Sequence, residues 1–302
     1  MIKYPLEIEL TNYCSLKCIS CVSRDLNNRW FLSENHFELI INFIINNSNN
    51  IDFIAIAWLG DTFMHPKIML YLDKLLVLKD LNIPILIPTK WNTLTEDIIK
   101  KIVELKNKGL NINIQLWIFS LKEDVTNFMA GLYDKKIDCF SFNYFEKFKI
   151  TIKNLKSYKL DFSIELLLTK FSENEIDSFH KFCKKLEVDW VIHRLHNFWW
   201  KLKTYNSLYS SKKFETRCAW VNLKEEESEY YGDICWFYPF INNEWNFFPW
   251  SFCTHYNLWN IEKFTWTFQD IIDKCYNTID MNNDFCKFCS DNFNALNLKN
   301  NE

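Results

Sequence analysis

Three cysteines near the start of the sequence carry its strongest chemical signal. Cys14, Cys18 and Cys21 stand in a C-x3-C-x2-C arrangement, directly after an apolar run that ends near Thr11. Three thiolates on one loop can bind three irons of a [4Fe–4S] cube and leave the fourth iron without a protein ligand. An iron of this kind can accept a small chelating molecule. Zinc ligation and purely structural cysteines are the alternatives for the same spacing.

A turn after the next strand-like run carries a second set of polar groups. Gly60, Asp61 and Thr62 lie there, in the stretch LGDTFMHP that starts at residue 59. Thr89 ends a third apolar run and Ser120 follows a fourth. Because the carboxyl ends of parallel strands meet at one edge, we expect these groups to gather near the three cysteines. An ordinary βα turn is the alternative for Gly60, and a capping or turn role is the alternative for Ser120.

The cysteine spacing and the turn together resemble the radical S-adenosylmethionine (radical SAM) superfamily. The resemblance implies that the three cysteines hold a [4Fe–4S] cluster whose open iron binds the amino and carboxylate groups of S-adenosylmethionine (AdoMet). The implied AdoMet contacts are Gly60, Asp61 and Thr62, similar to the family's GEP turn, Thr89, in a stretch similar to its TNG, and Ser120, at the ribose. The sequence departs from the family pattern at Ser20, where an aromatic residue is usual, and Asp61 and Thr62 stand in place of Glu and Pro.

Cysteines are dense again near the C-terminus. They stand at positions 218, 235, 253, 275, 286 and 289. This region resembles the SPASM/twitch family of auxiliary-cluster modules, and the resemblance implies that Cys235, Cys253, Cys286 and Cys289 bind a second [4Fe–4S] cluster. The four closely spaced cysteines of the full SPASM pattern are missing, so a single-cluster, twitch-like module is the better match, with Cys218 as an alternative ligand. A zinc site with four cysteine ligands would use the same residues.

The elements that must position these residues alternate along the chain in a βα pattern. The predicted strands cover residues 6–11, 53–58, 84–89, 112–119, 161–169 and 188–195. The predicted helices cover 33–46, 66–79, 93–108, 144–157 and 173–186. Repeated βα units around a parallel sheet predict an α/β fold, a partial (β/α)6 TIM-like barrel over residues 1–205. A small cysteine-rich module over residues 206–302 follows.

Composition excludes some partners and sets a compartment. The formal net charge of −3 offers no basic face for nucleic acid, so none is expected as a partner. The N-terminal residues lack the apolar core of a signal peptide and no stretch is long and apolar enough to span a membrane, which predicts a cytoplasmic protein. In a reducing compartment, a chain with 11 cysteines favours metal binding or redox work over disulfides.

The resemblance implies an enzyme with oxidoreductase-like chemistry. AdoMet would be cleaved reductively to a 5′-deoxyadenosyl radical, which abstracts a hydrogen atom from a substrate, with electrons from a donor such as flavodoxin or ferredoxin. Two substrate classes are compatible with the sequence. The twitch resemblance favours a ribosomally made peptide undergoing RiPP-type modification, and the alternative is a small molecule such as a sugar or cyclitol undergoing dehydrogenation or epimerisation. No peptide-recognition domain is expected before the strand at Leu6, which weakens the peptide alternative.

A protein of another class could carry the same cysteines. A non-enzymatic iron–sulfur or zinc protein that senses redox state or metal would need them too. Such a sensor would not need the turn at Gly60 placed after the next strand, so the conjunction of the two motifs favours the enzyme.

Overall fold

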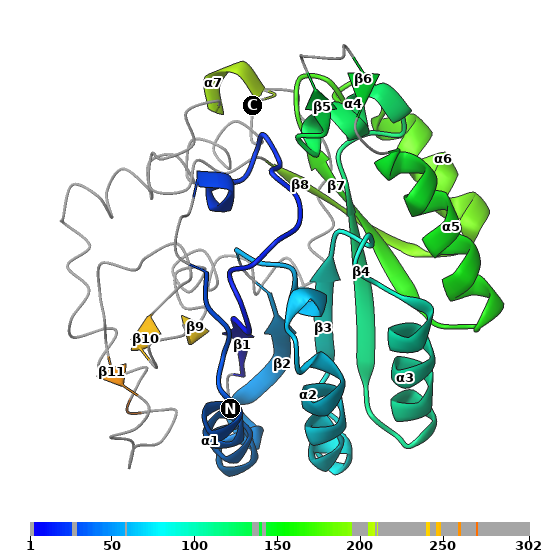
Figure 1. Cartoon of the computed structure of the whole chain (residues 1–302). Helices are drawn as coiled ribbons and strands as arrows, with labels where there is room; N and C mark the ends of the chain where they lie inside the picture. The colour runs from blue at the N-terminus through cyan, green and yellow to red at the C-terminus, as the bar shows by residue number, and fades with distance from the viewer. Residues whose placement is uncertain are drawn as a thin grey trace, which may run out of the picture.

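The structure is a computed structural model, and its described part consists of a nearly continuous N-terminal portion and short later segments. The described residues are 3–25, 29–57, 59–134, 139–140, 143–194, 205–208, 210, 240–241, 246–248, 259–260 and 270. Within them, a parallel sheet with helices packed along it dominates the architecture (Figure 1).

Six parallel strands lie side by side in chain order. They are β1 (Tyr4–Ile8), β2 (Ile51–Ile56), β3 (Ile85–Thr89), β4 (Ile112–Ile118), β7 (Phe162–Leu168) and β8 (Asp189–Arg194). Each neighbouring pair is parallel, in the order β1-β2-β3-β4-β7-β8. All six strands therefore end at the same edge of the sheet.

Helices connect the strands. The α-helices are α1 (Glu34–Asn46), α2 (Ile68–Leu75), α3 (Glu96–Asn107), α4 (Glu123–Met129), α5 (Tyr144–Ser157), α6 (Ile176–Leu186) and the short α7 (Tyr205–Leu208). Shorter 3-10 helices are η1 (Val22–Asp25), η2 (Ser48–Asn50), η3 (Thr62–Met64) and η4 (Leu76–Leu81). Ser33 and Thr95 begin α1 and α3, because their hydroxyls accept a hydrogen bond from a backbone N–H in the first turn.

Three short strands extend the sheet beyond β1, and two more pair within the connection between α4 and α5. β9 (Phe240–Ile241) pairs parallel to β1, and β10 (Asn246–Phe248) and β11 (Trp259–Asn260) follow outward in antiparallel pairs. β5 (Tyr133–Asp134) and β6 (Cys139–Phe140) form a separate antiparallel pair between α4 and α5.

The predicted α/β fold is confirmed for the six-stranded portion, whose order fits a partial TIM-like barrel. Each predicted strand and each of the five predicted helices has a counterpart, displaced by a few residues at the ends. The sequence did not predict α4, which contributes to the connection between β4 and β7. The division at residue 205 and the cysteine-rich module stay predictions, because most of residues 206–302 lie outside the described part.

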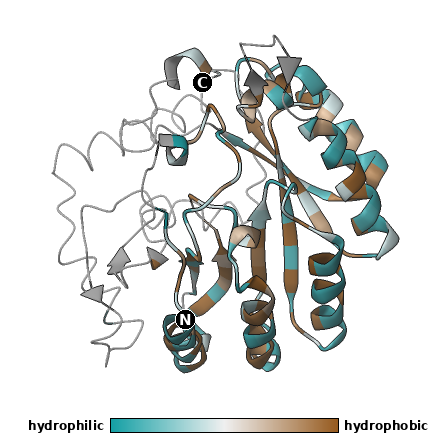
Figure 2. Cartoon of the chain, viewed as in Figure 1, coloured by the Kyte–Doolittle hydropathy of each residue, from teal (hydrophilic) through white to brown (hydrophobic). Residues whose placement is uncertain are grey.

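The two faces of the sheet differ in composition. Trp190 of β8 contacts the rings of Phe179 and His180 of α6, so its face of the sheet is the one that the helices cover. The register places Ile192, Leu166 and Ile118 on this outer face. These apolar side chains are buried, and burial of such side chains is the main favourable term in folding. Figure 2 shows the apolar colouring along the central strands.

The opposite face, called the inner face below, carries polar and aromatic groups. Trp117 of β4 lies beside Glu165 of β7, and Gln115 lies beside Ser163, in the register of the two strands. His193 of β8 lies on the same face, beside Leu167. The sheet thus separates an apolar layer under the helices from a face able to do chemistry.

None of the helices in the described part of the chain is long and apolar enough to cross a membrane.

Candidate functional site

The cysteines lie on a loop whose base is closed by backbone pairing. This cysteine loop, residues 12–25, leaves the carboxyl end of β1, and the chain returns beside it at Phe31. Thr11 and Phe31 form an antiparallel bridge, and the Leu32 N–H donates to the Leu10 carbonyl at 2.8 Å. The Thr11 hydroxyl donates to the Trp30 carbonyl at 2.7 Å. The base is therefore fixed where the loop enters and where it returns.

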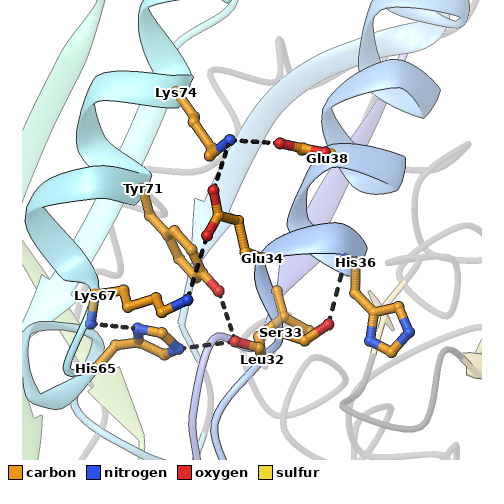
Figure 3. Close-up of polar contacts among 9 residues, drawn as sticks. All are labelled: Leu32, Ser33, Glu34, His36, Glu38, His65, Lys67, Tyr71 and Lys74. Carbon is orange, nitrogen blue, oxygen red and sulfur yellow. Dashed lines mark hydrogen bonds and ion pairs between the residues drawn. The ribbon is translucent and has the colours of Figure 1, made fainter.

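A set of hydrogen bonds, called the clamp below, joins Leu32, where the chain returns beside the cysteine loop, to the connection after β2. The Leu32 carbonyl accepts hydrogen bonds from the Tyr71 hydroxyl at 2.6 Å and from His65 Nε2 at 3.0 Å (Figure 3). His65 Nδ1 accepts from the Lys67 N–H at 3.1 Å, which assigns the ring proton to Nε2. Burial is the main cause that lowers the pKa of His65, so the neutral ring is favoured.

The turn after β2 touches the start of the cysteine loop so closely that only glycine fits. A Cβ atom on Gly60 would lie 2.1 Å from the Thr11 carbonyl oxygen. The next residue, Asp61, donates its N–H to the Tyr13 carbonyl at 2.9 Å. The predicted proximity of this turn and the cysteines is thus present in the structure.

A second glycine supports the middle of the loop. Gly131, just after α4, has φ +75°, and a Cβ there would lie 2.1 Å from the Lys17 carbonyl oxygen. The Ile19 N–H donates to the Met129 carbonyl at 2.9 Å. The chain has only four glycines, and two of them, Gly60 and Gly131, lie against the backbone of this loop, where a larger residue would not fit.

The three thiols face a common environment. Cys18 is 6% exposed, while Cys14 and Cys21 are half-buried, and all three are free. Burial is the main cause that raises the pKa of Cys18 to about 12 and that of Cys14 further still. The neighbouring thiols add to both shifts, because like charges close together oppose ionisation. Such thiols become thiolates only when a cation compensates their charge, as a metal centre does.

The three thiols are donors of the kind that an iron–sulfur cube uses. A [4Fe–4S] cube binds each thiolate to a different iron. Cys14, Cys18 and Cys21 lie close enough to one another for their charges to interact. Zinc ligation by the same cysteines stays the alternative.

Asp61 is the centre of a hydrogen-bond network between the β2 and β3 turns. Its carboxylate accepts from the Thr89 hydroxyl at 3.0 Å, from the Lys90 N–H at 3.2 Å and from the Phe63 N–H at 3.1 Å. Burial is the main cause that raises its pKa, and these hydrogen bonds act in the opposite direction. The carboxylate therefore fixes the geometry of the turn. The implied contact of this turn with the methionine amino group stays a prediction.

Thr62 and Thr89 both hold strand ends. The Thr62 hydroxyl donates to the Ile56 carbonyl at 2.8 Å, at the end of β2. The Thr89 hydroxyl, besides donating to Asp61, accepts from the Trp91 N–H at 3.2 Å. Both side chains are buried, so their hydroxyls act on the protein backbone and carboxylate around them.

Ser120 lies at the end of β4 and is fully buried. Its hydroxyl donates to Glu175 at 2.7 Å and accepts from the Lys122 N–H at 2.9 Å. Glu175, just before α6, also accepts from the Leu121 N–H at 2.6 Å. These contacts fix the turn after β4. The ribose contact implied for Ser120 stays a prediction.

Two charged residues near the loop were not among the predicted site residues. Lys90 follows Thr89 at the end of β3 and is the cation that acts most strongly on the Cys18 thiol. Burial is the main cause that lowers the pKa of Lys90, and the three thiols oppose that shift. Glu9, at the end of β1, accepts from the Leu59 N–H at 3.2 Å, and burial is the main cause that raises its pKa. The only sequence signal was their position at strand ends.

Solved structures resemble the chain although sequence comparison finds nothing. No protein-family model matches it, and no curated protein matches it. SuiB of Streptococcus suis bound to S-adenosylmethionine is similar with a TM-score of 0.59 at 16% identity, over 83% of this chain and 60% of SuiB. The chain thus spans less than two thirds of SuiB in this match. SuiB bound to precursor peptide SuiA gives a TM-score of 0.66 at 15% identity, over 94% of this chain and 69% of SuiB.

Two further proteins share the arrangement. The anSMEcpe structure with AdoMet and the Kp18Cys peptide gives a TM-score of 0.63 at 15% identity, over 92% of this chain and 83% of that one. BtrN in complex with AdoMet and 2-DOIA gives a TM-score of 0.50 at 13% identity, over 93% of this chain and 87% of BtrN. SuiB, anSMEcpe and BtrN are radical SAM enzymes. This chain has the radical SAM fold.

Beyond the strands of this radical SAM fold lie the residues predicted to bind a second cluster. Cys235, Cys253, Cys286 and Cys289, together with Cys218, lie outside the described residues. The described strands β9 and β10 form an antiparallel pair that falls between Cys235 and Cys253 in the sequence. The auxiliary cluster stays a prediction.

Proposed function

We propose that the protein is a radical SAM enzyme that cleaves AdoMet reductively and abstracts a hydrogen atom from a substrate. The observation that carries the proposal is the seating of the cysteine loop. Cys14, Cys18 and Cys21 lie at the carboxyl edge of a radical SAM fold, on a loop held in place by Gly60 and Gly131. A sensor protein would need the thiols but not this edge of a six-stranded sheet.

The residues of the loop have a defined part in the proposed reaction. The three thiolates would hold a [4Fe–4S] cluster, which supplies the electron that cleaves the sulfonium of AdoMet to a 5′-deoxyadenosyl radical. The Gly60 turn, held by Asp61 and Glu9, would present backbone carbonyls to the methionine amino group. Lys90 places a positive charge beside the thiolates and partly offsets their repulsion.

We propose a ribosomally made peptide as the substrate, modified in a RiPP-type reaction. The support is that SuiB is solved with its precursor peptide SuiA and anSMEcpe with the Cp18Cys and Kp18Cys peptides. A cyclitol or sugar is the second candidate, supported by the complex of BtrN with 2-DOIA. The second [4Fe–4S] cluster on the C-terminal cysteines, a flavodoxin or ferredoxin as electron donor and a cytoplasmic location complete the proposal.

Cluster loading and AdoMet binding test the proposal. Anaerobically reconstituted, dithionite-reduced protein should give the electron paramagnetic resonance signal of a [4Fe–4S] cluster, and AdoMet should change that signal. Cys18→Ala should abolish the AdoMet-dependent change. Cys183→Ser is the matched control, because Cys183 is a buried free thiol of α6 that takes no part in the site. A signal that AdoMet does not alter in wild type, or an AdoMet-dependent change that Cys18→Ala retains, contradicts the proposal.

A further inference from the structure

Buried polar atoms without hydrogen-bond partners are concentrated on the inner face of the sheet. Eight such side-chain atoms occur in the described part of the chain, and four of them belong to Gln115, Trp117, Ser163 and Glu165 on the adjacent strands β4 and β7. Their register makes them direct neighbours, since Gln115 pairs with Ser163 and Trp117 with Glu165. Unpaired buried polar atoms are rare in folded proteins and call for a partner.

A carboxylate–imidazole pair lies at the centre of this group. Glu165 is fully buried, and its Oε2 lies 2.9 Å from Nε2 of His193, whose side chain is 19% exposed. The other carboxylate oxygen, Oε1, has no partner. His193 stacks on the ring of Trp117, with centroids 4.7 Å apart and planes at 12°. The stacking fixes the imidazole plane, so the pair is held rigidly beside an unpaired acceptor.

The group continues across the sheet toward the cysteine loop. Lys90 Nζ lies 5.4 Å from the centre of the Trp117 ring. Lys90, just after β3, and Trp117, Glu165 and His193, on β4, β7 and β8, therefore form one contiguous group on the inner face, called the inner row below. Lys90 is also the cation that acts most strongly on the Cys18 thiol. One end of the row thus lies at the proposed radical-generating site.

We propose that the inner row is the substrate subsite, and that the Glu165–His193 pair binds a hydroxyl or protonated amino group of the substrate. The chemistry of the unpaired atoms sets this class. Glu165 Oε1 and Gln115 Oε1 are acceptors, the Ser163 hydroxyl both donates and accepts, and only Trp117 Nε1 is purely a donor. Such a set needs a ligand rich in donors. A protonated amine would bind more tightly than a hydroxyl, because a hydrogen bond between charged groups is about twice as strong as one between neutral groups.

The inference rests on the proposed function and deepens it. A radical formed beside Cys18 can act only on a substrate held nearby, and the side chains of the inner row begin there. A hydroxyl or amino group occurs both on peptide side chains and on aminocyclitols. The structure supplies the shared chemistry, and the experiment distinguishes the two sources.

Binding is measured at Trp117 itself. The full-length, anaerobically reconstituted protein with AdoMet is labelled with 5-fluorotryptophan, and the Trp117 resonance in the 19F NMR spectrum is assigned from Trp117→Phe. The probes are Nα-acetyl-lysine methylamide, for a peptide side chain, and 2-DOIA, the molecule bound in the BtrN structure, for a small-molecule substrate. Nα,Nε-diacetyl-lysine methylamide, which lacks the cationic amine, is the control ligand. At least one probe should shift the Trp117 resonance at millimolar concentration, and the control ligand should shift it less.

Variants show whether the pair is responsible. Glu165→Gln keeps the shape and removes the charge, and we expect at least about tenfold weaker binding of the amine probe. His193→Gln is the second variant, at a partly exposed position, in case the buried substitution prevents folding. Glu146→Gln, an exposed glutamate of α5, is the matched control and should bind like wild type.

The outcomes separate this inference from the proposed function. A Trp117 resonance that neither probe moves, or binding that both folded variants retain, overturns the inner row as the substrate subsite. AdoMet cleavage by wild type is measured in parallel. Cleavage without probe binding refutes this inference alone, whereas absence of cleavage refutes the proposed function.

Discussion

Replacing Gly60 by Ala tests whether the β2 turn seats the cysteine loop. The new Cβ would lie 2.1 Å from the Thr11 carbonyl oxygen, 2.8 Å from the Thr11 carbonyl carbon and 2.9 Å from the Asn12 carbonyl carbon. Heavy atoms in ordinary contact are about 3.5 Å apart, so the backbone must separate by more than about 1 Å. All three obstructing atoms are backbone, so no side chain can rotate away. The loop must therefore move as a whole.

The energetic cost of this substitution has two sources, steric overlap and a weakened hydrogen bond. Overpacking of this kind costs about 1–3 kcal/mol. The hydrogen bond from the Asp61 N–H to the Tyr13 carbonyl would stretch as well, which adds about 1 kcal/mol. We expect the free energy of unfolding of the metal-free protein to fall by about 2–4 kcal/mol. The displaced loop should also retain less iron and cleave less AdoMet.

Gly109→Ala is the matched control. Gly109 has φ +96°, yet nothing lies within 4 Å of a Cβ built there. Backbone strain alone should cost about 1–2 kcal/mol and leave iron binding intact. Urea unfolding followed by circular dichroism gives the stability of each variant, and iron analysis after anaerobic reconstitution gives the loading. If Gly60→Ala unfolds at the wild-type urea concentration and keeps its iron, the proposed seating of the loop is wrong.

Three further predictions concern the clamp and the C-terminal cysteines. Tyr71→Phe removes the buried hydrogen bond to the Leu32 carbonyl and should cost about 1 kcal/mol in urea unfolding, whereas Tyr158→Phe, which removes a solvent-exposed hydrogen bond from a half-buried tyrosine to Glu96, should cost less. Burial lowers the pKa of His65, so on acidification the unfolded chain takes up a proton on this ring near pH 6.5, before the folded chain does. The stabilisation that His65 gives the folded state is therefore complete above that pH. It declines as the pH falls toward the pKa of His65 in the folded state. Urea midpoints between pH 5 and 8 should show a smaller decline in His65→Asn than in wild type, and equal declines would contradict the assignment. Cys286→Ala with Cys289→Ala should spare AdoMet cleavage and abolish product formation, with iron falling by about half from about eight per chain; wild-type product formation by the folded double variant would show that these cysteines do not support turnover.

The sequence predicted the sheet well because its strands are long apolar runs separated by turn residues. β4, β7 and their neighbours appear within a few residues of their predicted bounds. The helix α4 was not predicted because its seven residues give too little apolar periodicity. The helix nevertheless matters for the site, because Met129 at its end and Gly131 just after it support the cysteine loop.

The predicted site residues were found where strand ends meet, but their partners were not predictable. Asp61 and Ser120 carry hydrogen bonds to Thr89 and Glu175, which lie 28 and 55 residues further along the chain. The inner row was not predicted either. Glu165 stands in the run FSIELLL, where a single carboxylate among apolar residues gives no sign of its partner His193. Side-chain partners across strands depend on register, which the apolar pattern alone does not specify.

Formation of 5′-deoxyadenosine tests the central claim most directly. Wild-type protein is reconstituted with iron and sulfide under anaerobic conditions, reduced with dithionite and incubated with AdoMet, and the products are separated by liquid chromatography and identified by mass spectrometry. We predict 5′-deoxyadenosine and methionine in equal amounts, formed slowly without substrate, and none from Cys18→Ala. A wild-type preparation that is loaded with cluster and fully reduced, yet forms no 5′-deoxyadenosine, would contradict the account.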